Sequence, residues 1–181
     1  MKIVKTEIPD LLIIEPKIYG DPRGWFVESW QAARYEEAGI INKFVQDNMS
    51  FSRRGTLRGL HLQKPAQGKL VQVIDGSIFD VAVDLRKESS TFGKWYGIFL
   101  TSENKKQFWI PAGFAHGFYV TSETALFSYK CTEYYNPKEE ISILWNDPII
   151  RIEWPIDSVP LLSDKDANAK SLQWWADQGK L

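Results

Sequence analysis

The chain has 181 residues, of which 44% are apolar and 25% are charged, and its formal net charge is −1. This length suits one domain with a core of its own, and the composition differs from that of a disordered or membrane chain. The balanced charge excludes a broad basic surface for nucleic acid, so a nucleotide ligand should be small. We expect a single domain over residues 1–181 and no nucleic-acid partner.

The first residues, from Met1 to Glu7, lack the apolar stretch of an export signal, and no apolar run is long enough to cross a bilayer. The single cysteine, Cys131, cannot form an intrachain disulfide, which fits a reducing compartment. These features predict a cytoplasmic protein without a membrane partner.

Most segments have the pattern of short strands, rich in β-branched and aromatic residues and separated by Gly, Pro, Asp, Asn or Ser. Strands are expected at 11–14, 24–30, 70–74, 78–85, 95–100, 107–110, 117–120 and 124–132. One helix is expected at 31–38, ending before Gly39, and another from about Ser163 onward. This pattern predicts a mainly β fold, a jelly-roll barrel or sandwich with short flanking helices.

The alternation of side chains along a strand sorts them between two faces. In the strand expected at 78–85, Asp80 and Asp84 share one face and the large apolar side chains share the other, so the acids face one cavity or one solvent surface. In the strand expected at 124–132, Tyr129 lies with Phe127 on a mainly apolar inward face. Lys130 then points the opposite way and cannot enter the same cavity.

The only two histidines, His61 and His116, concentrate the search for chemistry. Residues Pro111 to His116 follow the pattern Pro-x-Gly-x-x-His, which resembles the second motif of the cupin jelly rolls. Metal-binding cupins carry His-x-His in their first motif, where this chain has His61, Leu62 and Gln63. Two imidazoles and an amide are too few good ligands for zinc or iron. We therefore expect no metal and no cofactor, and no glycine-rich phosphate loop is present either.

Eight ordered blocks between residues 21 and 167 resemble the dTDP-4-dehydrorhamnose 3,5-epimerase family. They are Asp21-x-Arg23-Gly24-x-Phe26, Gln46-x-Asn48, Arg58 to His61, Gln67 to Val71, Phe79 to Arg86, Pro111 to His116, Tyr129 to Thr132 with Tyr134-Tyr135, and Ser163 to Asp166. The resemblance implies a metal-independent jelly-roll homodimer that acts on a dTDP-linked 4-keto-6-deoxyhexose. It also implies inversion at C3 and C5, the two carbons beside the ketone.

Inversion beside a ketone requires a base, a group that stabilises the enolate oxygen, and an acid on the opposite face of the sugar. The resemblance assigns His61 as the base, Asp166 as the carboxylate that orients it, Lys69 as the stabilising cation and Tyr129 as the acid. Each residue also has a structural explanation. Asp166 could cap a helix with Ser163, Lys69 could be a solvated strand-end lysine, and Tyr129 could simply pack in the core.

A nucleotide sugar also needs groups for its diphosphate, base and sugar. The resemblance assigns nucleotide-binding roles to Arg23, Phe26, Glu28, Gln46 and Asn48. We also expect Arg58, Asp80, His116 and Tyr135 to bind the substrate, with His116 and Asp80 as a supporting pair, and a structural ion pair is the alternative explanation for Arg58. Three alternatives remain: an epimerase that inverts only C3 or only C5, a non-catalytic jelly roll that binds a sugar nucleotide, and a metal-dependent cupin oxygenase. The missing metal ligands disfavour the last of these.

Overall fold

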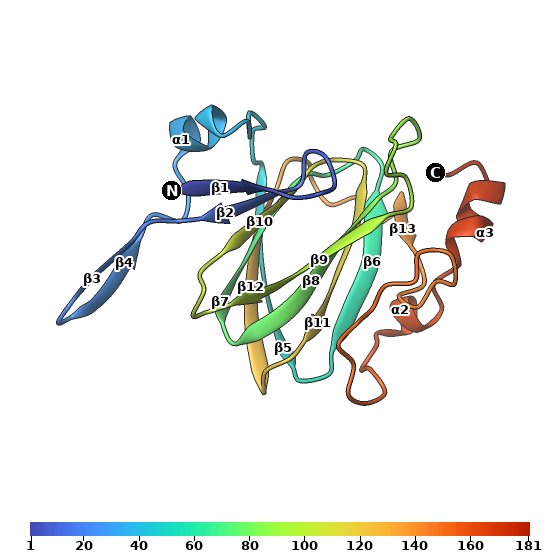
Figure 1. The fold of residues 1–181 in the computed structure, drawn as a ribbon. Coiled ribbons are helices and arrows are strands. Elements are labelled where there is room, and N and C mark those ends of the chain that lie inside the picture. Colours follow the sequence, from blue (N-terminus) through green and yellow to red (C-terminus); the bar gives the residue numbers. More distant parts are fainter.

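The computed structural model describes residues 1–181 as a sandwich of two antiparallel β-sheets with a few short helices (Figure 1). The expectation of a mainly β, jelly-roll type of fold is therefore confirmed. The helices are α1 (Ala32–Glu37), α2 (Asp164–Ala167) and α3 (Leu172–Asp177). None of the helices is long and apolar enough to cross a membrane.

The two sheets contain six and five strands. In spatial order, the larger sheet consists of β1 (Lys2–Lys5), β2 (Leu12–Glu15), β10 (Gln107–Ile110), β7 (Lys69–Asp75), β12 (Thr124–Cys131) and β5 (Gln46–Arg53). The smaller sheet consists of β13 (Glu140–Ser142), β6 (Leu57–Gln63), β11 (Phe114–Val120), β8 (Ser77–Asp84) and β9 (Trp95–Thr101).

The main hydrophobic core fills the space between the sheets and includes Val71 and Phe127 from the larger sheet and Ala82 and Phe118 from the smaller one. A second cluster covers the outer face of the smaller sheet, where the C-terminal segment packs Leu172 onto the alternate residues of β8. The two faces of β8 are thus both buried, but under different parts of the chain. This arrangement confirms the alternation expected for residues 78–85.

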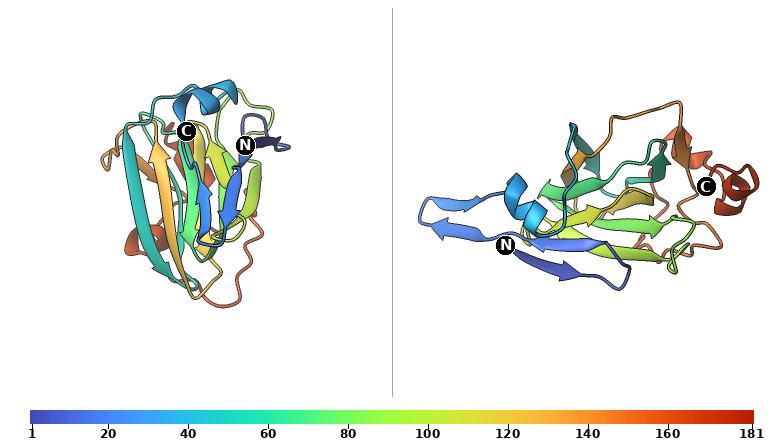
Figure 2. Two further views of the ribbon diagram at one scale, coloured as in Figure 1. Left: turned by 90° about the vertical axis from the view of Figure 1, so that its left-hand side faces the viewer. Right: turned by 90° about the horizontal axis from the view of Figure 1, so that it is seen from above.

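A hairpin formed by β3 (Ile18–Asp21) and β4 (Gly24–Val27) projects from the body at one end, and α3 lies at the other end (Figures 1 and 2). The hairpin carries several large, exposed side chains, including Tyr19, Trp25 and Phe26. It pairs with no other strand. An isolated two-stranded hairpin gains little stability by itself, so this segment is suited to contact something outside its own domain.

All the expected strands are present, but the expectation of one C-terminal helix is wrong. Ser163 caps α2, and Ser171 accepts a hydrogen bond from the backbone of Trp174 and begins α3 separately. The strand expected at 24–30 already ends at Val27, and the one expected at 117–120 begins earlier, at Phe114.

Five strands were not expected, and β5 explains why most clearly. Its inward face carries short polar side chains such as Asn48, whereas Met49 and Phe51 on its outward face are exposed. This is the reverse of the usual pattern, in which polar side chains face outward. The periodicity of residues 46–53 therefore does not indicate a strand whose inward face is buried.

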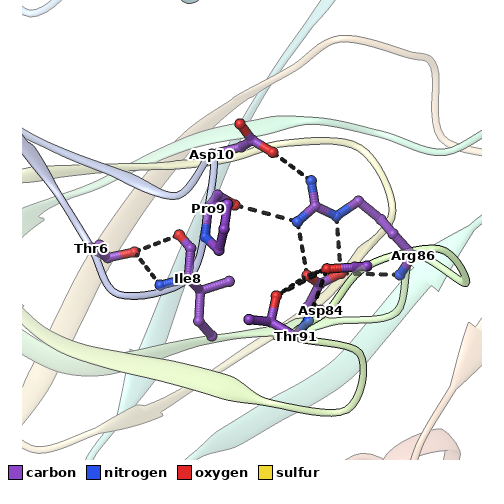
Figure 3. A network of polar contacts seen from close by, with 8 residues as sticks. Thr6, Ile8, Pro9, Asp10, Asp84, Arg86 and Thr91 are labelled. Atoms are coloured by element: carbon purple, nitrogen blue, oxygen red, sulfur yellow. Dashed lines mark hydrogen bonds and ion pairs between the residues drawn. The ribbon is translucent and has the colours of Figure 1, made fainter.

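The Asp84 carboxylate ties the end of β8 to the loop between β1 and β2 (Figure 3). It accepts hydrogen bonds from Nε and Nη2 of Arg86 at 2.9 and 2.8 Å and from the hydroxyls of Ser89 and Thr91 at 2.6 Å. Arg86 also donates to Asp10 at 2.6 Å. Burial alone would raise the pKa of Asp84, but these donors outweigh burial and hold the pKa well below its usual range.

Asp80 and Asp84 share a strand face as expected, but they do not share a cavity or a solvent surface. Both carboxylates are fully buried. Asp80 contacts His116 between the sheets, whereas Asp84 belongs to the Arg86 network at the strand end. The expectation of a common environment is wrong because residues four positions apart on an extended strand lie about 13 Å from each other.

We predict that Asp84→Asn lowers the free energy of unfolding at pH 7 by about 3 kcal/mol, because it removes the buried charge that pairs with Arg86 and leaves Arg86 with only the exposed Asp10 as a charged partner. The folded pKa of Asp84 is depressed, so its stabilisation is present above the unfolded pKa of about 4 and is lost as the pH falls through the folded pKa. Denaturant unfolding of both proteins between pH 7 and pH 2 measures the difference, which should shrink with acid.

A matched control is Asp21→Asn, because Asp21 pairs with Arg23 at the same spacing on an exposed turn. An exposed ion pair contributes little, so this variant should lose less than about 1 kcal/mol. Equal losses in the two variants, or a difference for Asp84→Asn that does not depend on pH, would contradict this account of the network.

Candidate active site

A cavity of about 490 Å³ opens between the two sheets, a size typical of sites for small ligands. Its lining combines residues from both sheets and from the segment that starts α2. The lining residues proposed from the sequence are Gln46, Asn48, Arg58, His61, Lys69, His116, Tyr129, Tyr135 and Asp166. Residues that are up to 120 positions apart in the chain therefore meet in one place.

His61 and Asp166 form the tightest polar contact of the cavity. Nε2 of His61 lies 2.5 Å from Oδ1 of Asp166, and the Asp166 side chain is only 3% exposed. Burial alone would raise the pKa of Asp166, but hydrogen bonding and charge interaction with His61 outweigh it, and the pKa is lowered. The carboxylate therefore remains ionised and holds the imidazole through Nε2. Nδ1 of His61 has no partner in the chain.

Asp166 also forms the helix cap that was the alternative explanation for it. The hydroxyl of Ser163 accepts a hydrogen bond from the backbone N–H of Asp166 at 3.2 Å and donates to its Oδ2 at 2.8 Å. The two explanations are therefore compatible. The cap holds the carboxylate in place, and the other carboxylate oxygen contacts His61.

His116 and Asp80 form a second pair, deeper in the sandwich. Nε2 of His116 lies 3.0 and 2.9 Å from the two oxygens of Asp80, and both residues are buried. Burial lowers the pKa of His116 and raises the pKa of Asp80, and the contact between the two opposes both changes. Only His116 reaches the cavity, so Asp80 lies behind it as a support.

Lys69, the first residue of β7, brings an ammonium group into the cavity without an ion pair or hydrogen bond to the chain. Burial lowers its pKa, and the charges of Cys131, Asp80 and Glu140 partly oppose this. The side chain is not a solvated strand-end lysine, which was the alternative explanation. A partly buried cation without a partner in the chain is well placed to attract an anion.

Tyr129 faces the cavity from β12 and packs its ring 5.4 Å from that of Phe127, centroid to centroid. Lys130 points to the opposite side, where it pairs with Asp47 at 2.9 Å, as the alternation predicted. Burial is the main reason that the pKa of Tyr129 is raised, so the phenol keeps its proton. Its hydroxyl makes no hydrogen bond within the chain.

The amides of Gln46 and Asn48 are held along the cavity wall. Nε2 of Gln46 donates to Oδ1 of Asn48 at 3.0 Å, and Oε1 of Gln46 accepts from the backbone N–H of Tyr135 at 2.9 Å. The Tyr135 ring, about half exposed, lies at the rim. Arg58 also lines the cavity and donates from Nε to Ser52 at 3.2 Å.

Four expected binding residues do not line this cavity: Asp80, which lies behind His116, and Arg23, Phe26 and Glu28. Arg23 and Phe26 lie on the projecting hairpin, where Phe26 is 65% exposed and Arg23 pairs with Asp21. Glu28 follows the hairpin and pairs with Arg34 at 2.7 Å. Within one chain, the structure does not bring these side chains to His61.

Two charged lining residues were missed by the sequence analysis. Glu140 accepts hydrogen bonds from Lys165 at 2.8 Å and from the Tyr135 hydroxyl at 2.9 Å. Glu140 lies in a run of charged residues, and its strand has only three residues, so no pattern in the sequence indicated that it enters the cavity. Lys165 stands within the block Ser163 to Asp166, which did provide a signal.

Gln63, which occupies the place of a second cupin histidine, is committed to the backbone. Its amide donates to the carbonyls of Pro65 and Tyr134 and accepts from the N–H of Asn136. No group of three or more His, Cys, Asp or Glu residues is arranged to hold a metal ion. The donor set of the cavity thus suits acid–base chemistry rather than metal coordination.

The comparisons with known proteins agree with this geometry. Residues 5–173 match the family model described as dTDP-4-dehydrorhamnose 3,5-epimerase. The chain is 57% identical over 175 residues to the dTDP-4-dehydrorhamnose 3,5-epimerase of Salmonella typhimurium, covering 95% of this chain and 96% of that protein.

Solved structures are similar over almost the whole chain. The dTDP-6-deoxy-D-glucose-3,5-epimerase of Legionella pneumophila, in complex with dTDP-4-keto-L-rhamnose, has a TM-score of 0.96 and 58% identity, covering 99% of this chain and 96% of that one. A 3'-monoepimerase of Streptomyces bikiniensis, in complex with dTDP-quinovose, has a TM-score of 0.91 and 33% identity, covering 97% and 90%. From its sequence, its fold and the residues of its cavity, this chain belongs to the dTDP-4-dehydrorhamnose 3,5-epimerase family.

Proposed function

We propose that the chain converts dTDP-4-dehydro-6-deoxy-D-glucose into dTDP-4-dehydro-L-rhamnose by inverting C3 and C5. The observation that carries this proposal is the position of His61 and Tyr129, which enter one cavity from opposite sheets, with Lys69 between them in the sequence and in the same lining. A base and an acid on different walls can remove a proton from one face of a sugar and return one to the other.

His61 is the proposed base, and Asp166 is its orienting partner. Nδ1 of His61 takes the proton from the carbon beside the ketone, and the electron pair of the broken C–H bond moves onto the C4 oxygen as an enolate. The neighbouring Asp166 carboxylate stabilises the imidazolium that results, as the third member of a catalytic triad does.

Lys69 is the proposed stabiliser of the enolate oxygen. Its ammonium has no partner in the chain, so it is available to the negative charge that develops on the C4 oxygen. A cation that is already in place before the reaction stabilises such a charge strongly, because the site does not need to reorganise.

Tyr129 is the proposed acid. Its neutral phenol donates a proton to the carbon from the face opposite His61, the enolate collapses to the ketone, and the configuration is inverted. Solvent then returns a proton to Tyr129 and removes one from His61. The same groups serve C3 and C5 in turn, since both carbons flank one ketone.

The remaining lining residues support proposed binding roles. The amides of Gln46 and Asn48 and the ring of Tyr135 suit the thymine base, and Arg58 suits the diphosphate. His116, backed by Asp80, suits a sugar oxygen. We propose that no metal takes part, because the side chains present already supply a base, a cation and an acid.

We also propose a homodimer in which the hairpin of one copy completes the cavity of the other. The exposed aromatic side chains of the hairpin suit burial against a second copy, and a two-fold arrangement would place the unused Arg23, Phe26 and Glu28 near a second nucleotide site. The single buried, unpaired Cys131 is consistent with a reducing compartment, and we propose the cytoplasm as the place of action.

A single-site epimerase is the second candidate, because the Streptomyces bikiniensis 3'-monoepimerase has a similar fold at 33% identity. The higher identity to 3,5-epimerases favours the double inversion. Both reactions need the same base, cation and acid, so the residues of the cavity do not separate them. The non-catalytic binding protein is disfavoured by the unpaired Lys69 and by the ordered contact of His61 with Asp166.

The first prediction from the proposed function is that the chelator-treated chain inverts C3 and C5 and, in heavy water, incorporates deuterium at both carbons. Each inversion replaces a carbon-bound proton with one that comes from solvent through Tyr129. NMR of the sugar product measures both the configuration and the deuterium. Deuterium at only one carbon would establish the single-site epimerase, and an unchanged sugar would refute catalysis.

Tyr129→Phe provides the matched variant, because it keeps the ring and removes the acid. His61 should still remove and return protons on its own face, so exchange with solvent should fall less than inversion. In His61→Ala, exchange and inversion should be lost together. If Tyr129→Phe lost both equally, the assignment of Tyr129 as the acid alone would be incorrect.

A second prediction concerns the coupling of His61 and Asp166. Because one orients the other, His61→Ala should lose roughly 10³-fold or more in kcat, and adding Asp166→Ala should cost little further. Ser163→Ala, which removes only the cap, should have a smaller effect than Asp166→Ala. The model of a coupled pair fails if the double variant loses the product of the two single factors.

A third prediction tests the shared cavity by mixing two defective proteins. Arg23→Ala and His61→Ala should each be weakly active or inactive as homodimers. After dissociation and reassembly in equal amounts, about half the dimers are hybrids with one intact site, so about a quarter of the wild-type activity should return. Arg23 would serve its own chain, contrary to the proposal, if mixing restored nothing.

A further inference from the structure

The hydroxyl of Ser50 is unusual among the buried polar groups of this chain. Its Oγ is the one buried side-chain nitrogen or oxygen that has no hydrogen-bond partner. Buried hydroxyls are nearly always paired, and an unpaired one destabilises the fold, so a single exception in an otherwise satisfied structure calls for an explanation.

Ser50 faces the cavity from the middle of β5. Along this strand, Gln46, Asn48, Ser50 and Ser52 form an inward row, and the residues between them point outward. Gln46 bonds to Asn48, and Ser52 accepts from Arg58, so only Ser50 is free. Its hydroxyl is therefore the unused member of a polar row that lines the proposed substrate site.

The surroundings of Ser50 define what it could bind. Its partner in register on β12 is Phe127, which packs on the rings of Phe118 and His116. Aromatic rings therefore surround this part of the cavity, and Arg58, also a lining residue, bonds to Ser52, the next member of the row. Arginine only donates hydrogen bonds, whereas a serine hydroxyl both donates and accepts. A sugar hydroxyl between the two could accept from Arg58 and donate to Ser50.

The proposed reaction narrows the choice of hydroxyl. A 4-keto-6-deoxyhexose linked through C1 has free hydroxyls at C2 and C3 only. Inversion at C3 moves the C3 hydroxyl to the other face of the ring, whereas C2 keeps its configuration throughout. A fixed side chain such as Ser50 can hold only a group that stays in place while both neighbours of the ketone are inverted.

We propose that Ser50 is a substrate-binding residue that holds the C2 hydroxyl of the sugar and so anchors the ring during both inversions. This inference rests on the proposed function and adds a contact to it. Phe127, beside Ser50, and Tyr129, beside Asn48, lie two residues apart on β12, so the anchor is close to the proposed acid. A ring fixed at C1 and C2 can still shift so that first one and then the other carbon beside the ketone lies between His61 and Tyr129.

The test combines Ser50→Ala with a substrate that lacks the same contact, the dTDP-linked 4-keto-2,6-dideoxyhexose. With the normal substrate, Ser50→Ala should lower kcat/KM roughly three- to tenfold, the effect of one neutral hydrogen bond. The wild type should lose a similar factor with the 2-deoxy substrate. Ser50→Ala should lose nothing further with it, because the contact is already absent.

Ser128→Ala is the control, because Ser128 lies on the neighbouring β12 and points away from the cavity, and it should behave as the wild type. Affinity for dTDP alone and the midpoint of thermal unfolding should be undiminished in Ser50→Ala, since only an unpaired hydroxyl is removed. The inference is overturned if Ser50→Ala loses the same factor with both substrates, or none with the normal one. A wild type that transforms neither substrate would instead overturn the proposed function, and this inference with it.

Discussion

The pairing of buried polar groups between the two sheets is the constraint on which the site depends. A buried charge without a partner is costly, so most such groups in this chain are matched, as Asp166 is with His61 and Asp80 is with His116. Nδ1 of His61, the ammonium of Lys69 and the hydroxyls of Tyr129 and Ser50 have no partner in the chain. The proposed chemistry uses these unmatched groups, because a group that is already satisfied by the chain has little left to offer a substrate.

The sandwich makes this selective pairing possible because it has two walls. His61 stands on the smaller sheet, and Lys69 and Tyr129 stand on the larger one, so the cavity between the sheets receives a histidine–carboxylate pair from one side and a cation and a phenol from the other. Asp166 reaches His61 only because the C-terminal segment packs across the outside of the smaller sheet. The C-terminal segment therefore contributes both to the second hydrophobic cluster, through Leu172, and to the proposed catalytic pair, through Asp166.

Periodicity predicted the regular parts of the fold and the faces of β8 and β12, because those strands have apolar residues on at least one face. It placed Tyr129 on the inward side and Lys130 on the outward side correctly. It missed β5 because the inward face of that strand is polar, which is the feature that makes it part of the site. The prediction of a common environment for Asp80 and Asp84 was wrong. Alternation predicts on which face of a strand two side chains lie, but not how far apart they are along that face.

The residues of the site were predicted from the family resemblance and not from periodicity. No spacing rule links His61 to Asp166, which is 105 residues away, and the family resemblance supplied that pairing before any contact was known. Glu140 and Lys165 were missed because charged residues near strand and helix ends usually face solvent. The proposed binding roles of Arg23, Phe26 and Glu28 depend on a second copy of the chain. A single sequence contains no signal for such an arrangement.

The most direct test of the central claim is a crystal structure of the chain with a dTDP-linked 6-deoxyhexose that has a hydroxyl in place of the C4 ketone and therefore cannot react. In that complex the C4 oxygen stands for the developing enolate oxygen. We predict that it lies within hydrogen-bond distance of Nζ of Lys69, with His61 and Tyr129 on opposite faces of the sugar ring. A sugar bound outside the cavity, or His61 and Tyr129 on the same face of the ring, would contradict the account.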